Sequence, residues 1–168
     1  MLTIVETERL SIRQITNEDA INLSKVLADP IVMEYSTVGV HTEEQIYDYI
    51  ANCKNQYDLN GYGHWAIYNS ITSQFVGVCG LNKHKVDTDD VIHINYRLAT
   101  DQQGKGYAVE SAFGVLHFAK NSLKLKSVHA LIDSANINSV KVVNRTGFQF
   151  IKSSVFRGFK VDIYQVAL

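Results

Sequence analysis

Apolar and polar residues alternate in several short segments of this chain, which is the pattern of β-strands with one buried face. The first such segment is Glu8–Ile15. His64–Tyr68 and Phe75–Leu81 follow, and the polar segment Asn69–Ser73 between them predicts a hairpin. The other expected strands are Val91–Leu98, Val128–Ile132, Phe150–Val155 and Val161–Val166, of which the last two pair around Arg157 and Gly158.

A period near 3.6 residues marks four helices between these strands. The first follows the cap Asn17–Asp19, and the second opens on the capping box Thr42–Gln45. The third begins directly after Gly106, and the fourth covers Asn136–Thr146. Hairpin-linked strands run antiparallel, whereas strands joined through a helix usually run parallel. The order of elements therefore predicts a single α+β domain over residues 1–168 with a mixed sheet.

The composition is that of an ordinary globular protein, with 46% apolar and 20% charged residues. A net charge of −1 and the lack of a basic stripe disfavour a nucleic-acid-binding protein. No apolar run approaches the roughly 18 residues of a membrane span, and the acidic N-terminus lacks the layout of a signal peptide. Cys53 and Cys79 have no metal-ligand spacing, so we expect two buried free thiols in a cytoplasmic protein and no metal.

The most informative stretch is the turn after Val91–Leu98, which carries Gly104-Lys105-Gly106 directly before a helix. Glycines let the backbone approach a ligand closely, and the unpaired N–H groups of a first helical turn point at an anion. The turn therefore predicts a site for a phosphorylated cofactor. A Walker loop does not match these residues, and a dinucleotide fingerprint would need a third glycine where Val109 stands.

With these segments in place, the chain resembles the GNAT superfamily of acyl-CoA-dependent N-acetyltransferases, and within it the branch of ribosomal-protein N-acetyltransferases (RimJ/RimL-like). The opening Glu6–Arg13 resembles the start of that branch, and Phe75–Leu81 resembles its hairpin strand. Gln103–Ala108 is similar to its pyrophosphate loop and Asn136–Phe148 to a second cofactor segment. The resemblance covers essentially the whole chain. It implies a mixed, mostly antiparallel central sheet of about seven strands flanked by four helices.

The resemblance implies that acetyl-CoA is the cosubstrate and that backbone groups bind much of it. Amides on the strand before the turn, where a bulge parts it from its neighbour, would hold the pantetheine arm and polarise the thioester. The residues implied in cofactor binding are Tyr96, Arg97, Leu98, Gln103, Gly104, Lys105, Gly106, Tyr107, Ala108 and Asn136. Two positions depart from the family's pattern. Asp101 stands where Arg or Gln is frequent, and Gln103 stands where many branch members have an aromatic residue.

The same resemblance implies that an amine attacks the thioester directly, which requires a proton acceptor and a proton donor. Counting back from the turn, His93 stands where many members place a glutamate base, and an imidazole suits that role. His64 and His84 on neighbouring strands are alternatives. Where many members have an acidic tyrosine, this chain has Val143, so Ser139 is the candidate for protonating the thiolate. A strand histidine facing solvent and a serine bonded to its own helix are the purely structural readings.

Two functions remain open at this point: an N-acetyltransferase acting on a primary amine, and a catalytically idle acyl-CoA-binding module with a sensing or scaffold role. The acceptor would be a small-molecule or peptide amine, such as a protein N-terminus, a polyamine, an amino acid or an aminoglycoside-like drug. By resemblance, Val26–Gln45 and Val155–Phe159 would line its cleft. Glu110 is expected to act on the dipole of the third helix. A monomer or a homodimer is expected, since an exposed edge strand of such a sheet can pair between subunits.

Overall fold

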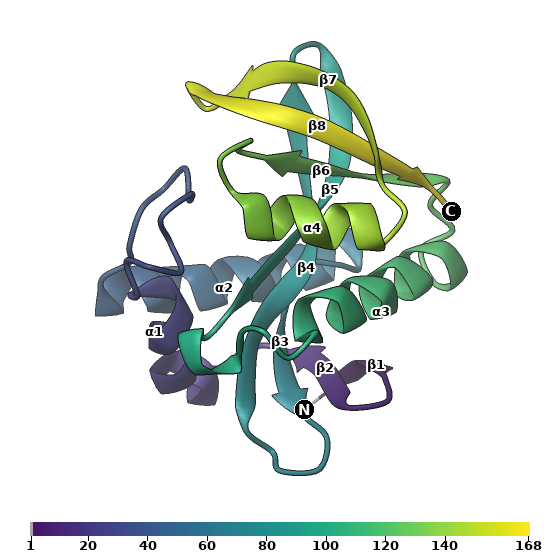
Figure 1. Cartoon of the computed structure of the whole chain (residues 1–168). Helices are drawn as coiled ribbons and strands as arrows, with labels where there is room; N and C mark the ends of the chain where they lie inside the picture. Colours follow the sequence, from purple (N-terminus) through teal and green to yellow (C-terminus); the bar gives the residue numbers. More distant parts are fainter. Residues whose placement is uncertain (1) are drawn as a thin grey trace.

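The computed structural model describes residues 2–168, which form one eight-stranded sheet with helices on both faces (Figure 1). The strands lie in the order β1-β2-β3-β4-β5-β6-β8-β7, and every neighbouring pair is antiparallel except β5 and β6. The strands are β1 (Thr3–Glu6), β2 (Leu10–Gln14), β3 (His64–Asn69), β4 (Phe75–Val86), β5 (Asp89–Leu98), β6 (Ser127–Ile132), β7 (Gln149–Phe156) and β8 (Phe159–Ala167). The helices are α1 (Ala20–Leu27), α2 (Glu43–Asn60), α3 (Tyr107–Asn121) and α4 (Ile137–Arg145).

The expected α+β class, the four helices and the mixed, mostly antiparallel sheet are confirmed, and the sheet has one strand more than expected. The additional strand is β1, which has only four residues and pairs with β2. Strand β4 continues past Leu81 to Val86, and β5 begins at Asp89, so the two strands form one long hairpin. Val86 and Val91 pack there against Ile163, which extends the pairing into residues expected to form a loop.

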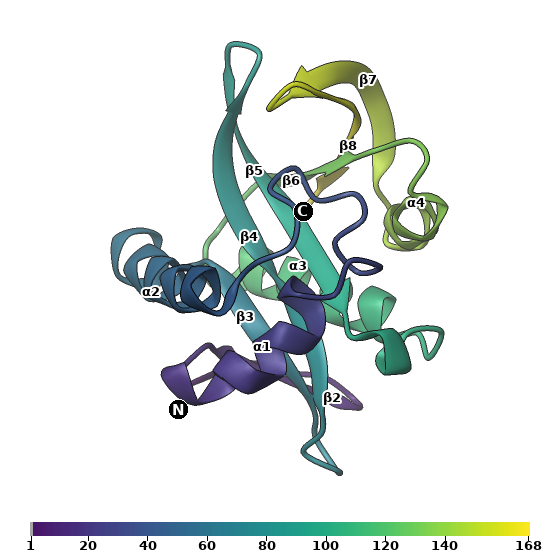
Figure 2. The same ribbon diagram turned by 90° about the vertical axis from the view of Figure 1, so that its left-hand side faces the viewer.

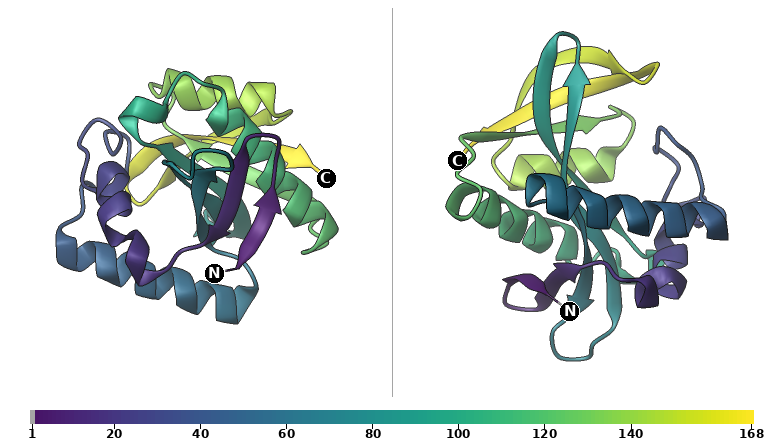
Figure 3. Two further views of the ribbon diagram at one scale, coloured as in Figure 1. Left: turned by 90° about the horizontal axis from the view of Figure 1, so that it is seen from below. Right: turned by 180° about the vertical axis from the view of Figure 1, so that it is seen from behind.

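Alternation of side chains along the strands divides the interior into two apolar cores on opposite faces of the sheet. On one face, Trp65 and Ile67 of β3 pack in the same core as Val115 of α3. On the other face, Ala66 packs with buried residues of α1 and α2, among them Leu23. Figures 2 and 3 show α1 and α2 on one side of β3 and β4 and α3 on the other.

Each core contains one cysteine. Cys53 lies in the core beneath α1 and α2, and Cys79 lies in the core beneath α3. Both are buried free thiols, as the sequence predicts. Burial raises the pKa of the Cys53 thiol to about 12, and it raises the pKa of Cys79 as well. Both thiols are therefore protonated at neutral pH, which makes them poor nucleophiles.

Strands β5 and β6 are joined at a single register position, which pairs His93 with His129. Strand β6 pairs with β8 along its whole length, and β5 pairs with β4 along its whole length. Within residues 2–168, the part of β5 beyond His93 therefore has no strand partner on its second edge. In Figure 1, β1 to β3 lie in the lower part of the molecule and β6, β8 and β7 in the upper part, and the long β4–β5 hairpin extends from one to the other.

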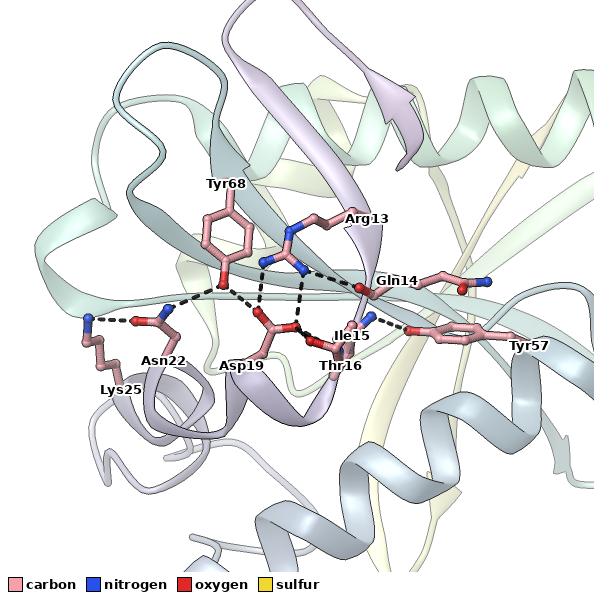
Figure 4. Close-up of polar contacts among 9 residues, drawn as sticks. All are labelled: Arg13, Gln14, Ile15, Thr16, Asp19, Asn22, Lys25, Tyr57 and Tyr68. Atoms are coloured by element: carbon pink, nitrogen blue, oxygen red, sulfur yellow. Dashed lines mark hydrogen bonds and ion pairs between the residues drawn. The ribbon is translucent and has the colours of Figure 1, made fainter. Parts of the chain in front are cut away.

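A buried ion pair between Arg13 of β2 and Asp19 fastens the start of α1 to the sheet (Figure 4). Arg13 Nη2 lies 2.8 Å from Asp19 Oδ1, and the Tyr68 hydroxyl of β3 donates to the same oxygen at 2.5 Å. The Asp19 residue is only 1% exposed. Burial alone would raise the pKa of its carboxyl, but hydrogen bonds from Tyr68, Thr16 and Arg13 outweigh this effect and hold the pKa below its usual range.

The substitution Asp19→Ala removes this carboxylate and leaves the Arg13 guanidinium buried without its partner. Loss of one member of a buried ion pair costs roughly 3–5 kcal/mol, so we expect the free energy of unfolding to fall by about that amount in urea denaturation. Asp58→Asn changes an exposed residue of α2 and is the control, with an expected change below about 0.5 kcal/mol. Equal stability of Asp19→Ala and the wild type would show that the pair is not an anchor.

Candidate active site

A cavity of about 720 Å³ opens on the α1–α2 face of the sheet, and His93, the last residue that joins β5 to β6, lines it. Its floor contains His93, Asn95 and Arg97, which alternate along β5 and so share one face of the strand. Other lining residues come from α2, from the loop between α1 and α2 and from the β7–β8 hairpin. The cavity therefore lies between the two segments that the resemblance assigns to an acceptor cleft.

A chain of hydrogen bonds connects the buried His93 to the surface. His93 Nε2 lies 2.7 Å from His84 Nδ1, and His84 Nε2 lies 3.0 Å from Arg157 Nη2. A guanidinium only donates hydrogen bonds, so His84 Nε2 is the acceptor and His84 Nδ1–H donates to His93 Nε2. Arg157 is exposed at the turn between β7 and β8, whereas His93 is only 5% exposed. The chain thus runs from the floor of the cavity to its rim.

His64 of β3 occupies another part of the cavity wall. Its Nδ1 lies 2.7 Å from the Tyr49 hydroxyl of α2, and its Nε2 lies 2.8 Å from Asn82 Nδ2 of β4. Both ring nitrogens are therefore engaged by side chains that were not expected at the site. Gly80 of β4, which pairs with His64, has no room for a side chain, because an added Cβ would lie 2.1 Å from the Gly63 carbonyl oxygen.

The imidazoles of His64, His84 and His93 are uncharged at neutral pH. Burial lowers the pKa of His93 to about 3, and the neighbouring His84 and His64 add to the effect. Burial likewise lowers the pKa of His64 to about 3, with a further contribution from the Arg97 charge. The pKa of His84 is also lowered, first by burial and then by Arg157. The histidines therefore offer neutral donors and acceptors and no positive charge.

The opposite face and the free edge of β5 supply backbone donors. The Ala99 N–H donates to the Val76 carbonyl on β4, so by alternation the N–H groups of Leu98 and Tyr96 point to the edge that β6 leaves free. Consistent with this direction, the Leu98 carbonyl accepts a hydrogen bond from Gln103 Nε2 at 3.2 Å. The amide of Arg97 points to β4 instead, and its side chain lines the cavity.

The turn between β5 and α3 has the backbone that the sequence predicts. Gly104 and Gly106 have φ angles of +75° and +82°, in the left-handed region that favours glycine. Across residues 2–168, no protein acceptor meets the backbone N–H groups of Gly104, Lys105, Gly106, Tyr107, Ala108 and Val109. The Lys105 ammonium donates to Gln102 Oε1 at 3.2 Å. Unpaired amides at a helix start are the donor set that holds an anionic phosphate group.

Glu110 has a structural partner that sequence reasoning missed. Its carboxylate forms an ion pair with Arg9 at 2.7 Å and accepts hydrogen bonds from the Thr7 hydroxyl and the Arg9 N–H. Arg9 Nη1 also donates to the Lys105 carbonyl at 3.0 Å. Glu110 thus ties the β1–β2 turn to the glycine turn, a contact over about a hundred positions of sequence that no local pattern reveals. The expectation that it acts only on the helix dipole is too narrow.

Helix α4 begins near the free edge of β5. Asn136, which was expected inside the fourth helix and as a cofactor-binding residue, is the N-cap of α4, and Asn136 Oδ1 accepts from the Ser139 N–H at 3.2 Å. The Tyr96 hydroxyl reaches from β5 to α4 and donates to the Ser139 carbonyl at 3.0 Å. In the described chain, the Ser139 hydroxyl itself has no hydrogen-bond partner, whereas Val143 is fully buried in the core. The serine hydroxyl therefore does not cap the backbone.

The expected site residues fall on two sides of β5. Backbone donors of the strand, the glycine turn and α4 lie on one side, and the three histidines line the cavity on the other. Sequence reasoning missed Tyr49, Asn82 and Asn95, which complete the polar lining. The sequence does indicate Asn95, because His93, Asn95 and Arg97 place polar residues at every second position of an otherwise apolar strand.

Comparison with known proteins supports one family. The family model described as "Acetyltransferase (GNAT) domain" matches residues 9–149. The uncharacterized protein YkkB of Bacillus subtilis is 30% identical over 154 residues, which cover 90% of this chain and 88% of that protein. The uncharacterized N-acetyltransferase p20 of Bacillus licheniformis is 28% identical, with 96% and 93% covered. The fold matches the RimL ribosomal L7/L12 α-N-protein acetyltransferase in complex with coenzyme A at a TM-score of 0.80 and 16% identity, covering 99% of this chain and 98% of that one.

None of the helices in residues 2–168 is long and apolar enough to cross a bilayer. No group of three or more His, Cys, Asp or Glu side chains in the range is arranged to hold a metal ion.

The buried histidines predict a specific loss of stability in acid. A histidine has a pKa near 6.5 in an unfolded chain, and the pKa of both His64 and His93 is about 3 in the folded protein. Between these values the unfolded chain binds more protons, so stability falls as the pH drops below 6.5, by roughly 2 kcal/mol per histidine down to pH 5. Urea denaturation at several pH values should show a shallower decline for His64→Gln/His93→Gln than for the wild type. His117→Gln, which alters an exposed histidine, should leave the decline unchanged.

Proposed function

The chain belongs to the GNAT acetyltransferase family and is an N-acetyltransferase, and on this premise we propose that it transfers the acetyl group of acetyl-CoA to a primary amine bound in the cavity on the α1–α2 face. In this reaction the amine nitrogen attacks the thioester carbonyl directly. A C–N bond forms, the C–S bond breaks, the nitrogen loses a proton and the thiolate gains one. The observation that carries the proposal is the position of β5, whose free edge and glycine turn offer amides while its other face lines a polar cavity.

The proposed cofactor site uses groups that have no protein partner within residues 2–168. The amides of Gly104 to Ala108 would bind the pyrophosphate, with Lys105 as a nearby positive charge. The amides of Tyr96 and Leu98 would bind the pantetheine arm and the thioester carbonyl. Asn136 Oδ1 is occupied as a helix cap, but its Nδ2 is unbonded and suits a pantetheine carbonyl. Gln103 holds the Leu98 carbonyl and so shapes the same edge.

His93 remains our proposal for the group that accepts the amine proton. Two observations limit how it does so. Its pKa of about 3 prevents it from storing a proton near neutral pH, and its Nε2 accepts a hydrogen bond from His84. We therefore propose that the acceptor enters as the uncharged amine. The proton that the nitrogen releases during attack would pass to His93 Nε2 as this atom gives up its hydrogen bond from His84, and from there to water in the cavity, because Arg157 at the end of the chain cannot accept a proton.

Ser139 is the proposed proton donor to the departing thiolate. Its hydroxyl is unbonded among the described residues, and it lies in the first turn of α4, one turn after Asn136. The helix start there also favours a developing negative charge. The acceptor is proposed to be a small amine or the N-terminus of a peptide, because the cavity volume of about 720 Å³ suits a molecule or segment of that size.

Incubation with acetyl-CoA and a panel of amines and N-terminal peptides tests the proposed transfer by release of free thiol and by the mass of the acetylated product. Gly104→Ala should raise the KM for acetyl-CoA by about tenfold, because the φ of +75° costs a side chain about 1–2 kcal/mol and the turn would relax away from the phosphate-binding shape. Gly61→Ala imposes the same strain at φ +73° at the end of α2, outside both cofactor segments, and should leave this KM unchanged. Coenzyme A binding without transfer to any amine would instead support the idle acyl-CoA-binding module.

The pH dependence of transfer tests the proposed entry of an uncharged amine. Because the pKa of His93 is about 3, kcat/KM should rise with pH along the free-amine fraction of the acceptor and show no inflection near 6.5. Two acceptors whose amine pKa values differ should give profiles displaced by that difference. His93→Gln should lower kcat and leave the affinity for coenzyme A nearly unchanged. A wild-type inflection near pH 6.5 that disappears in His93→Gln would show that a charged His93 takes part.

A further inference from the structure

The guanidinium of Arg97 lines the cavity without a protein partner. Within residues 2–168 it forms no hydrogen bond, no ion pair and no stacking contact with an aromatic ring. The other partly or fully buried arginine in the sheet behaves differently, because Arg13 is matched by Asp19 at 2.8 Å. Arg97 is half-buried, and a cation whose contact with bulk water is restricted commonly has an anionic partner.

No group of the cavity supplies that partner. The residues whose charges or dipoles act on Arg97 are Tyr49 and His64, and the His64 imidazole is neutral. Of the lining acids, Glu34 and Asp48 are exposed. The third, Asp133, accepts a hydrogen bond from the Ala135 N–H, and none of the three lies within ion-pair distance of Arg97. Removal from water accordingly lowers the pKa of Arg97.

A second unpartnered group faces the same cavity. His41, which is not part of the proposed chemistry, lines the cavity with its Nδ1 atom buried and without a hydrogen-bond partner. Its ring packs edge-on against Tyr49, whose hydroxyl is bonded to His64. Within residues 2–168 the cavity therefore holds an unpartnered guanidinium and an unpartnered imidazole nitrogen, whereas the lining residues Glu34, Asp48, Asn52 and Lys160, which also have no partner, are exposed. A ligand that supplies acceptor oxygens would satisfy the guanidinium, and it would also satisfy His41 in the tautomer that carries its hydrogen on Nδ1.

We propose that the amine acceptor of this enzyme carries a carboxylate and that Arg97 binds it. The inference rests on the proposed function, since it assigns the acceptor class of the same cavity. A carboxylate matches the planar guanidinium through two parallel hydrogen bonds. One negative charge also balances one unpaired cation among neutral imidazoles, whereas a phosphate group would bring nearly two charges and a polyamine would add positive ones.

The Arg97 side chain acts separately from its backbone. Its amide is paired toward β4, so substitution of the side chain leaves both the strand pairing and the free amides of Tyr96 and Leu98 in place. Asn95 separates Arg97 from His93 on the same face of β5, and the two Cα atoms are about 13 Å apart at the usual rise of a strand. This spacing does not determine the distance between the amine and the carboxylate of the acceptor. The test panel therefore includes α-, β- and γ-amino acids.

The first experiment compares kcat/KM for each amino acid with that for its carboxamide and its decarboxylated amine. The wild type should prefer the acid by about tenfold or more, the usual worth of a charge-assisted bidentate pair. In Arg97→Gln this preference should fall to nearly one, through a rise in KM for the acid, and Arg97→Lys should retain part of it. Lys83→Gln removes a cation on the cavity rim that is already paired with Asp90 at 3.3 Å, and it should keep the wild-type preference.

The second experiment measures thermal stability without any acceptor. Because Arg97 lacks a partner, Arg97→Met should raise Tm in the ligand-free protein, whereas an arginine with a structural role would lower it. Addition of the preferred amino acid should raise the Tm of the wild type and leave that of Arg97→Met unchanged.

The outcomes separate this inference from the proposed function. Equal transfer to acids, amides and plain amines would overturn the carboxylate assignment and leave the acetyltransferase activity established. Transfer to no amine, together with amino-acid stabilisation that depends on Arg97, would overturn the proposed function and support the carboxylate site. A preference for acids that persists unchanged in Arg97→Gln would also overturn the assignment, because another group would then bind the carboxylate.

Discussion

Strand β5 is paired along its whole length on one edge and through one register position on the other. Strand β6 pairs with β8 along its whole length but meets β5 only where His93 pairs with His129. Backbone donors that an ordinary sheet would consume are consequently left free at Tyr96 and Leu98. The strand that carries them leads directly into the glycine turn, so the free edge and the helix start form one continuous set of amides.

The alternation of side chains adds a second use of the same strand. Residues with even numbers from Ile94 to Leu98 face the core and helices α3 and α4, and those with odd numbers from His93 to Arg97 line the cavity. Two reactants held on these two sides of one strand would meet at its backbone. On the proposed function this geometry would bring the two reactants together there, and Arg97 is the charged side chain of a floor whose His93 imidazole is too buried to hold a proton near neutral pH.

Local features of the site were predictable from sequence, and contacts between distant segments were not. Two glycines before a helix predict a turn with unpaired amides, which is present at Gly104 and Gly106, whereas the capping role of Asn136 was not predicted. The fold class followed from the order of alternating and 3.6-residue periods. The partner of Glu110 and the missing partner of Arg97 depend on which strands lie side by side, and β1 is too short to show a period. The assigned chemical roles remain predictions.

The two cysteines have a practical consequence. Each is buried in a separate core, and the high pKa keeps both in the unreactive thiol form. A disulfide dye added to the folded enzyme would thus colour only with the coenzyme released by turnover, free of background from the polypeptide. In the presence of denaturant the same dye would report the rate of global unfolding, because one cysteine is buried on each face of the sheet.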